Sequence, residues 1–248
     1  MVRYFLELSY NGAGYHGWQN QPNAISVQEV IEKALSVLLR KKTAIAGAGR
    51  TDAGVHAKQM FAHFDAETDL DLINLVFKLN SILPNDIAIH DVFKVKTDAH
   101  TRFDALSRTY LYRVALKKNV FTFNDAYYVK QALDLKKMNE ASKILFEYTN
   151  FQCFSKSKTD VKTYDCDIMN VEWFYKDEEL HFVIKANRFL RNMVRAIVGT
   201  MINIGLGKLN KEDVHAIIQS KNRSKAGISV PGHGLYLTHI EYPEDIKI

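Results

Sequence analysis

Hydrophobic and polar positions in the first hundred residues alternate between helix spacing and strand spacing, with short runs rich in aromatic and branched side chains. An apolar stripe at helical spacing follows Ser26, which makes a capping-box pattern with Glu29. A second helix is predicted to begin after Thr68 or Asp69 and to end before Pro84. The strands predicted in this half are 3–10, 43–46, 57–64 and 86–95. The resulting order, β-α-β-β-α-β, is that of a ferredoxin-like fold.

The second half repeats this order of elements without a repeat at the level of residues. Asp134 is predicted to cap a helix, and a hairpin is predicted around the polar turn 176–179. A long helix is predicted over about 188–204, and a short one from Asn210. The strands predicted in this half are 108–115, 165–175, 180–187 and 235–242.

This pattern predicts an α+β protein of two ferredoxin-like halves. The boundary is expected near 100–107, so that residues 1–105 form the N-terminal half and residues 106–248 form the C-terminal half. The polar stretch 155–164, which holds three lysines, is interpreted as a flexible loop.

Composition narrows the class of protein. Of the 248 residues, 47% are hydrophobic and 25% are charged, which is typical of a globular chain with a buried core. Cys153 and Cys166 are the two cysteines; two are too few for a disulfide scaffold, and their spacing, with no CxxC, excludes a zinc ribbon. No apolar run approaches the roughly 18 residues of a membrane span, and Glu7 interrupts the first apolar run. We therefore expect a soluble, cytoplasmic protein.

Basic side chains gather in two segments of a chain whose formal net charge is +5. Residues 94–118 hold seven, against two acids, and residues 188–225 hold eight. In the predicted long helix, Arg188, Arg191 and Arg195 are spaced three and four apart, which predicts one stripe of guanidinium groups. The stripe is either a solvated helix face or a surface that binds phosphates, and the pattern leaves both interpretations open.

The glycine-rich segment 47–57 lies between two predicted strands and is longer than a tight hairpin requires. Arg50 and Asp52 are two residues apart, so they project to the same side of an extended chain. A neighbouring guanidinium favours an ionised carboxylate, which suits a nucleophile or a general base. The alternative is a structural Arg–Asp pair in an Asx turn. His56 is either a catalytic group or, more commonly, a hydrogen-bonding support.

At this point the residues resemble a known family. GRTDAGVHA (49–57) resembles the active-site motif of the TruA family of tRNA pseudouridine synthases. Other segments that are similar to the family are YNGAGYHGWQ (10–19), SVQE (26–29), RTYLYRV (108–114), KANRFLRNMVRAIVG (185–199) and GLYL (234–237). Because these segments occur in the family's order along most of the chain, the resemblance is specific.

The resemblance implies that uridines 38, 39 and 40 in the anticodon arm of tRNA become pseudouridine. It also implies one extended, mostly antiparallel sheet with helices on one face, a central basic cleft and a homodimer. A metal, a cofactor, DNA and a membrane are not expected. Asp52 is implied as the nucleophile and Arg50 as its partner. Tyr110 would pack against the target base and relay its C5 proton, Arg195 would lie in the cleft, and Leu235 would support the pocket floor.

Two departures from the family pattern concern substrate contacts. Cys153 stands where relatives often have Ser, and Lys162 stands where an Arg is usual, which removes a bidentate contact. Two other classes of protein compete with the synthase. A non-catalytic RNA-binding protein of two RRM-like halves should carry an RNP1 pattern, which is absent from the sequence. A metal-dependent hydrolase using Asp52 and His56 should gather further acids, and none lies near Asp52 in the sequence.

Overall fold

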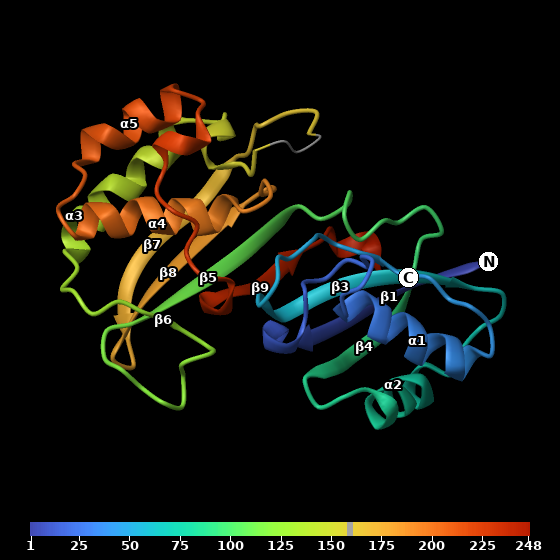
Figure 1. Cartoon of the computed structure of the whole chain (residues 1–248). Coiled ribbons are helices and arrows are strands. Elements are labelled where there is room, and N and C mark those ends of the chain that lie inside the picture. Colours follow the sequence, from blue (N-terminus) through green and yellow to red (C-terminus); the bar gives the residue numbers. More distant parts are fainter. Residues whose placement is uncertain (158–160) are drawn as a thin grey trace. The chain divides into compact units, whose positions relative to one another are not determined.

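The computed structural model describes residues 1–157 and 161–248 (Figure 1). They divide into two compact units, Met1–Leu106 with Leu237–Ile248, and Ser107–Tyr236. The strands belong to a large, mostly antiparallel sheet accompanied by helices, so the predicted α+β class is confirmed. Within the described residues, no helix has the length and apolar character needed to cross a bilayer. Part of the predicted loop 155–164 lies outside the described residues.

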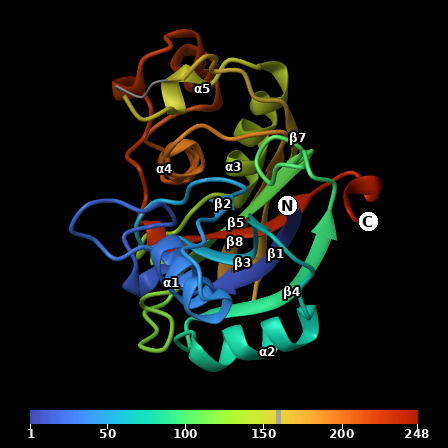
Figure 2. The ribbon, with the colours of Figure 1, turned by 90° about the vertical axis from the view of Figure 1, so that its right-hand side faces the viewer.

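The first unit has the strand order of a ferredoxin-like fold. Its elements are β1 (Val2–Tyr10), α1 (Val27–Leu39), β2 (Ala46–Gly47), β3 (His56–Ala66), α2 (Leu72–Ile82) and β4 (Ile87–Val95). β1 pairs antiparallel with both β3 and β4, and β2 pairs antiparallel with β3. The resulting order β4-β1-β3-β2 is that of the split β-α-β arrangement. Figures 1 and 2 show α1 and α2 side by side on one face of these strands.

The two helices of this unit begin at capping side chains. The Ser26 Oγ accepts a hydrogen bond from the Glu29 N–H at 3.2 Å, so the predicted start of α1 is confirmed. The predicted start of α2 at Thr68 or Asp69 is wrong, because Asp71 caps the helix and accepts from the Asn74 N–H at 3.2 Å. Asp69 instead pairs with Lys94 on β4 and accepts from the Tyr4 hydroxyl. Asp69, one of the two residues predicted to cap the helix, therefore forms tertiary contacts instead.

The second unit follows the same plan. Its elements are β5 (Ser107–Ala115), β6 (Tyr127–Tyr128), α3 (Leu135–Ser142), β7 (Ile168–Lys176), β8 (Glu179–Ala186), α4 (Met193–Gly205), α5 (Lys211–Gln219) and the beginning of β9 (Leu235–Glu241). The strand order is β9-β5-β8-β7, with β8 antiparallel to both neighbours. β6, which pairs with β5, is not among the predicted strands. Figure 1 shows the helices gathered over β7 and β8.

The division into units differs from the predicted halves at the C-terminus. The predicted C-terminal half ran from residue 106 to residue 248. In the structure the units divide between Leu106 and Ser107, and Leu237–Ile248 belongs with the first unit. β9 therefore begins in the second unit and ends in the first.

The predicted long helix over 188–204 starts too early. α4 begins at Met193, after Asn192 in the left-handed region at φ 69°, a conformation that no helix interior accepts. Arg188 and Arg191 lie in the segment before the helix, and only Arg195 lies on it. The predicted stripe of three guanidinium groups on one helix face is therefore wrong.

Candidate functional site

The loop between β2 and β3, residues 48–55, is held by backbone contacts to the segment before α1. The Trp18 N–H donates to the Thr51 carbonyl at 3.3 Å, and the Gly54 N–H donates to the Tyr15 carbonyl at 3.3 Å. The Tyr10 hydroxyl lies 2.9 Å from Thr51 Oγ1. The two sequence segments 10–19 and 49–57 therefore form one structure.

Two glycines make this close approach possible. A Cβ added at Gly12 would lie 2.0 Å from the Val55 carbonyl oxygen, and one added at Gly17 would lie 2.3 Å from the Thr51 carbonyl oxygen. Gly17 also has φ +97°, a backbone conformation that is strained for any residue with a side chain. The backbone of residues 12–17 is therefore in direct contact with the loop. A side chain in place of Gly12 or Gly17 would displace the loop.

His56, at the start of β3, supports this contact. Its ring is 2% exposed, and its Nδ1 accepts a hydrogen bond from the Gly12 N–H at 3.1 Å. Since that nitrogen must be unprotonated to accept, and the ring is buried, the structure favours the supporting role over the catalytic one.

Asp52 lies near the middle of the loop and is partly exposed, whereas Arg50 is exposed. The Asp52 carbonyl accepts from the Val55 N–H at 3.2 Å, which closes a turn after the carboxylate. No contact that the structure describes joins the two side chains, so their pairing stays a prediction. The loop presents a carboxylate on a backbone that is fixed on both sides, which is the arrangement that a nucleophile or base requires.

The remaining predicted site residues belong to the second unit. Tyr110 on β5 is partly exposed, and its ring packs edge-to-face on Phe189, with ring centroids 5.1 Å apart at 89°. Leu235 is buried at the start of β9. Tyr112, two residues after Tyr110, donates its hydroxyl hydrogen to the Pro231 carbonyl at 2.8 Å, and burial raises the pKa of Tyr112 above its usual value. The buried phenol therefore stays protonated and remains a donor.

Arg195 is bonded to the loop before β9. Its Nε donates to the Val230 carbonyl at 2.7 Å, and its own carbonyl accepts from the Val230 N–H at 3.3 Å. This reciprocal pair places the guanidinium group beside loop 226–234, which leads into β9. The loop fixes the orientation of the only arginine of the predicted stripe that lies on α4.

Sequence reasoning missed the residues that hold loop 226–234. The Ser229 hydroxyl oxygen accepts from Asn192 Nδ2 at 2.6 Å and lies 2.8 Å from Arg223 Nη2, which also donates to it. The Gly227 N–H donates to Thr200 Oγ1 at 2.9 Å inside the core. The run of glycines and proline in 227–234 was the available signal, because such a run between a helix and a strand marks a structured loop.

The basic segment 94–118 is largely neutralised by acids within each unit. Four of its seven basic side chains form ion pairs, which are Lys94–Asp69, Lys96–Asp245, Arg113–Glu179 and Lys117–Glu178, at 2.6–2.8 Å. Arg108 donates to the Asn187 carbonyl at 2.9 Å. The segment therefore offers far less uncompensated charge to a polyanion than its composition suggests.

Comparison with known proteins identifies the class. A family described as tRNA pseudouridine synthase matches residues 148–243. The chain is 53% identical over 246 residues to tRNA pseudouridine synthase A of Bacteroides fragilis, covering 98% of each chain. It is 53% identical over 249 residues to the protein of that name from Bacteroides thetaiotaomicron (99% and 93% covered), and 48% identical over 250 residues to that from Porphyromonas gingivalis (99% of each). The chain therefore belongs to the tRNA pseudouridine synthase A family, the TruA family, as its motifs indicated.

Proposed function

We propose that this protein converts uridine to pseudouridine at positions 38, 39 and 40 in the anticodon arm of tRNA, with Asp52 as the nucleophile. The observation that carries the proposal is the position of Asp52, partly exposed on a loop that Tyr15 and Trp18 hold through its backbone. The end-to-end identity of 53% with a tRNA pseudouridine synthase A supports the same reaction.

The reaction is an isomerisation that needs no redox partner and no phosphate donor. The N1–C1′ bond of the uridine breaks, the uracil turns, a C5–C1′ bond forms, C5 loses a proton and N1 gains one. An ionised Asp52 can attack C1′, add to C6 of the uracil, or remove the 2′ proton to give a glycal. All three paths require the carboxylate, and we assign to Arg50 the role of keeping it ionised.

The target uridine is stacked in the RNA and must first be extruded, which costs a few kcal/mol. We assign to the Tyr110 ring the replacement of the lost stacking, worth on the order of 1–3 kcal/mol, and to its hydroxyl the relay of the C5 proton. Arg195 contacts the substrate, and Leu235 supports the floor of the base pocket. Because the Tyr110 ring already rests on Phe189, it meets the base in a defined orientation.

We further propose that the enzyme is a homodimer with a basic cleft and acts in the cytoplasm, where its tRNA substrate is found. Sedimentation of the purified protein at several concentrations tests the dimer. A single species with the mass of one 28.4 kDa chain across that range would reject it.

Release of tritium from tRNA transcripts that carry 5-³H-uridine tests the reaction. Wild type should release tritium, and Asp52→Ala should not, while both bind tRNA. Asp98→Ala, which removes an exposed carboxylate outside the loop, is the matched control and should behave as wild type. If folded wild type binds tRNA without release, the protein is an RNA-binding protein and the proposed reaction is wrong. If Asp52→Ala stays active, another group is the nucleophile.

A further inference from the structure

The segment between β4 and β5, residues 96–106, carries a column of aromatic rings that begins in the core of the first unit and ends at its surface. His63 on β3 is buried, and the His100 ring meets it edge-on with centroids 4.5 Å apart. The Phe103 ring lies 4.3 Å from that of His100 and is 74% exposed. The outermost ring of the column, that of Phe103, is therefore exposed to solvent.

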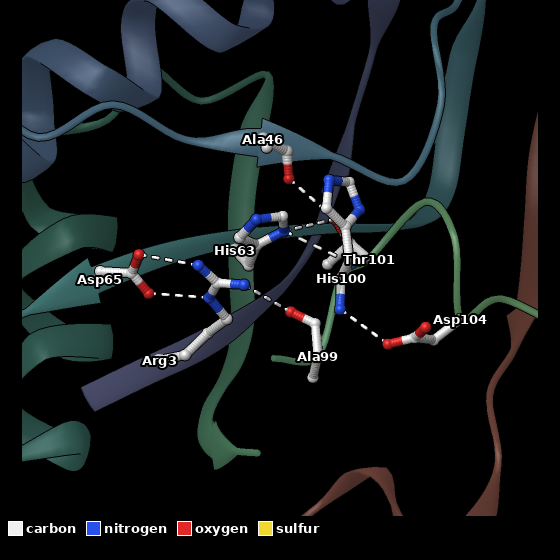
Figure 3. A network of polar contacts seen from close by, with 8 residues as sticks. All are labelled: Arg3, Ala46, His63, Asp65, Ala99, His100, Thr101 and Asp104. Atoms are coloured by element: carbon white, nitrogen blue, oxygen red, sulfur yellow. Dashed lines mark hydrogen bonds and ion pairs between the residues drawn. The ribbon is translucent and has the colours of Figure 1, made fainter. Parts of the chain in front are cut away.

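The inner end of the column is bonded to the strand that leads into the Asp52 loop. Figure 3 shows Thr101 between His63 and Ala46, with Thr101 Oγ1 lying 2.9 Å from His63 Nδ1 and 2.9 Å from the Ala46 carbonyl oxygen. Because a carbonyl only accepts, the Thr101 hydroxyl donates its proton to Ala46, and the Thr101 N–H donates to His63 Nδ1 at 3.4 Å. Ala46 opens β2, directly before loop 48–55.

The outer end of the column is held in place by a tight turn. The His100 N–H donates to Asp104 Oδ2 at 2.7 Å, and the Phe103 N–H donates to the His100 carbonyl at 3.1 Å. The Arg102 N–H donates to His100 Nδ1 at 3.1 Å, and its guanidinium carbon lies over the Phe103 ring at 5.7 Å from the centroid. The backbone that carries the exposed ring is therefore held before any ligand arrives, which lowers the entropy cost of binding.

We propose that Phe103, backed by His100 and flanked by Arg102, is a stacking site for an unpaired base of the RNA substrate other than the target uridine. The inference rests on the proposed function, because it takes RNA as the ligand. Unpaired bases of RNA stack on aromatic rings and on guanidinium planes, and this site offers both. Its connection through Thr101 to Ala46 ties the bound base to the strand that precedes Asp52. The column therefore sets the register of the RNA on the first unit.

Replacement of the ring tests the site. Phe103→Ala should raise both the Kd and the KM for tRNA roughly fivefold or more, the loss expected for one stacked base. The kcat should stay within about twofold, because the ring does not touch the reacting atoms. The slope of log K against log salt should be unchanged, because stacking neutralises no phosphate. Phe77→Ala, which removes a ring on α2 that is 71% exposed, is the matched control and should bind tRNA as wild type does.

Phe103→Trp supplies a direct readout. It should recover most of the affinity, and saturating tRNA should quench its emission, whereas Trp18 and Trp173 are buried and serve as the wild-type background. Unchanged affinity in Phe103→Ala, an equal loss in Phe77→Ala, or unquenched emission in Phe103→Trp would each overturn the site. So would a change in sedimentation of Phe103→Ala at unchanged tRNA affinity, which would make the ring a protein contact. Absence of tritium release from wild type contradicts the proposed function instead, and is read independently of these variants.

Discussion

At the scale of single residues, His63 shows how burial sets a charge state. Loss of hydration lowers the pKa of His63 to about 4, and the nearby His100 ring and Arg3 guanidinium act in the same direction. Asp65 and Asp104 oppose the shift. In the neutral ring that results, Nδ1 can accept the hydrogen bond that the Thr101 N–H donates at 3.4 Å.

This shift predicts a specific pH dependence of stability. Between pH 6.5 and about 4, the unfolded chain binds a proton at His63 that the folded chain does not, so the free energy of unfolding falls as pH falls through that window. At pH values below both pKa values, this difference in proton binding lowers the free energy of unfolding by about 3 kcal/mol. Above pH 6.5 it has no effect. His63→Gln keeps an amide group that can form a hydrogen bond with Thr101 but does not titrate, so urea unfolding should show it losing less stability than wild type between pH 7 and pH 4. Parallel curves for the two proteins would remove His63 as the cause.

The hydroxyl of Tyr110 can be separated from its ring by a second substitution. Tyr110→Phe keeps the ring on Phe189 and removes only the proposed relay for the C5 proton. Tritium release should slow by roughly 100-fold, the lower end of the range for removal of an acid–base group, while tRNA binding is kept. Tyr175→Phe, on an exposed ring of β7, is the control. A wild-type rate in Tyr110→Phe would leave packing as the whole role of Tyr110.

At the scale of elements, local spacing was sufficient at two helix starts and at one hairpin turn. Ser26 and Asp134 cap their helices as predicted, and the turn at Asp177 and Glu178 closes the β7–β8 hairpin with φ 48° and 63°. Spacing failed at α4, because the left-handed Asn192 is stabilised by a hydrogen bond to Ser229, 37 residues away. A local sequence pattern cannot predict that contact. The predicted arginine stripe is absent because Arg188 and Arg191 precede the first turn of α4.

The contact between α4 and loop 226–234 leads to a stability prediction. Thr200 is fully buried, donates to the Ala196 carbonyl and accepts from the Gly227 N–H, both at 2.9 Å. Thr200→Val keeps the volume but leaves that N–H buried without its acceptor, which costs about 1–3 kcal/mol. Thr200→Ser keeps the hydroxyl and should lose less. Urea unfolding of the three proteins decides this, and a Val variant as stable as the Ser variant would show that the hydrogen bond contributes nothing.

At the scale of the whole molecule, the fold class could be predicted from the order of the elements, whereas the role of Asp52 stays a prediction from its motif. The electrostatics could not be predicted in this way. The sequence places basic residues in segment 94–118, but it does not say that the acid beside Lys96 is Asp245, 149 residues further along, or that Lys94 faces Asp69. Ion pairs between distant positions depend on strand register and on where the chain end lies. Composition therefore overstated the charge available to RNA.

The pairing of these basic side chains with carboxylates predicts how RNA binding depends on salt. Each phosphate neutralised by a basic side chain adds about 0.7 to the slope of log K against log salt for a single strand. Lys94 and Lys96 already face carboxylates, so Lys94→Ala/Lys96→Ala should leave the slope for tRNA nearly unchanged. If both lysines contacted phosphates in wild type, the double substitution would instead lower the slope by about 1.4.

The complementary variant removes the acids. In Asp69→Ala/Asp245→Ala both ammonium groups lose their partners, so tRNA should bind more tightly at low salt and with a steeper slope. Filter binding between about 50 and 200 mM salt covers the range in which such slopes are resolved. A fall of about 1.4 in the lysine variant would mean that RNA displaces the carboxylates. In that case segment 94–118 contacts phosphates as well as carrying Phe103, and the two ion pairs hold the lysines only until the substrate binds.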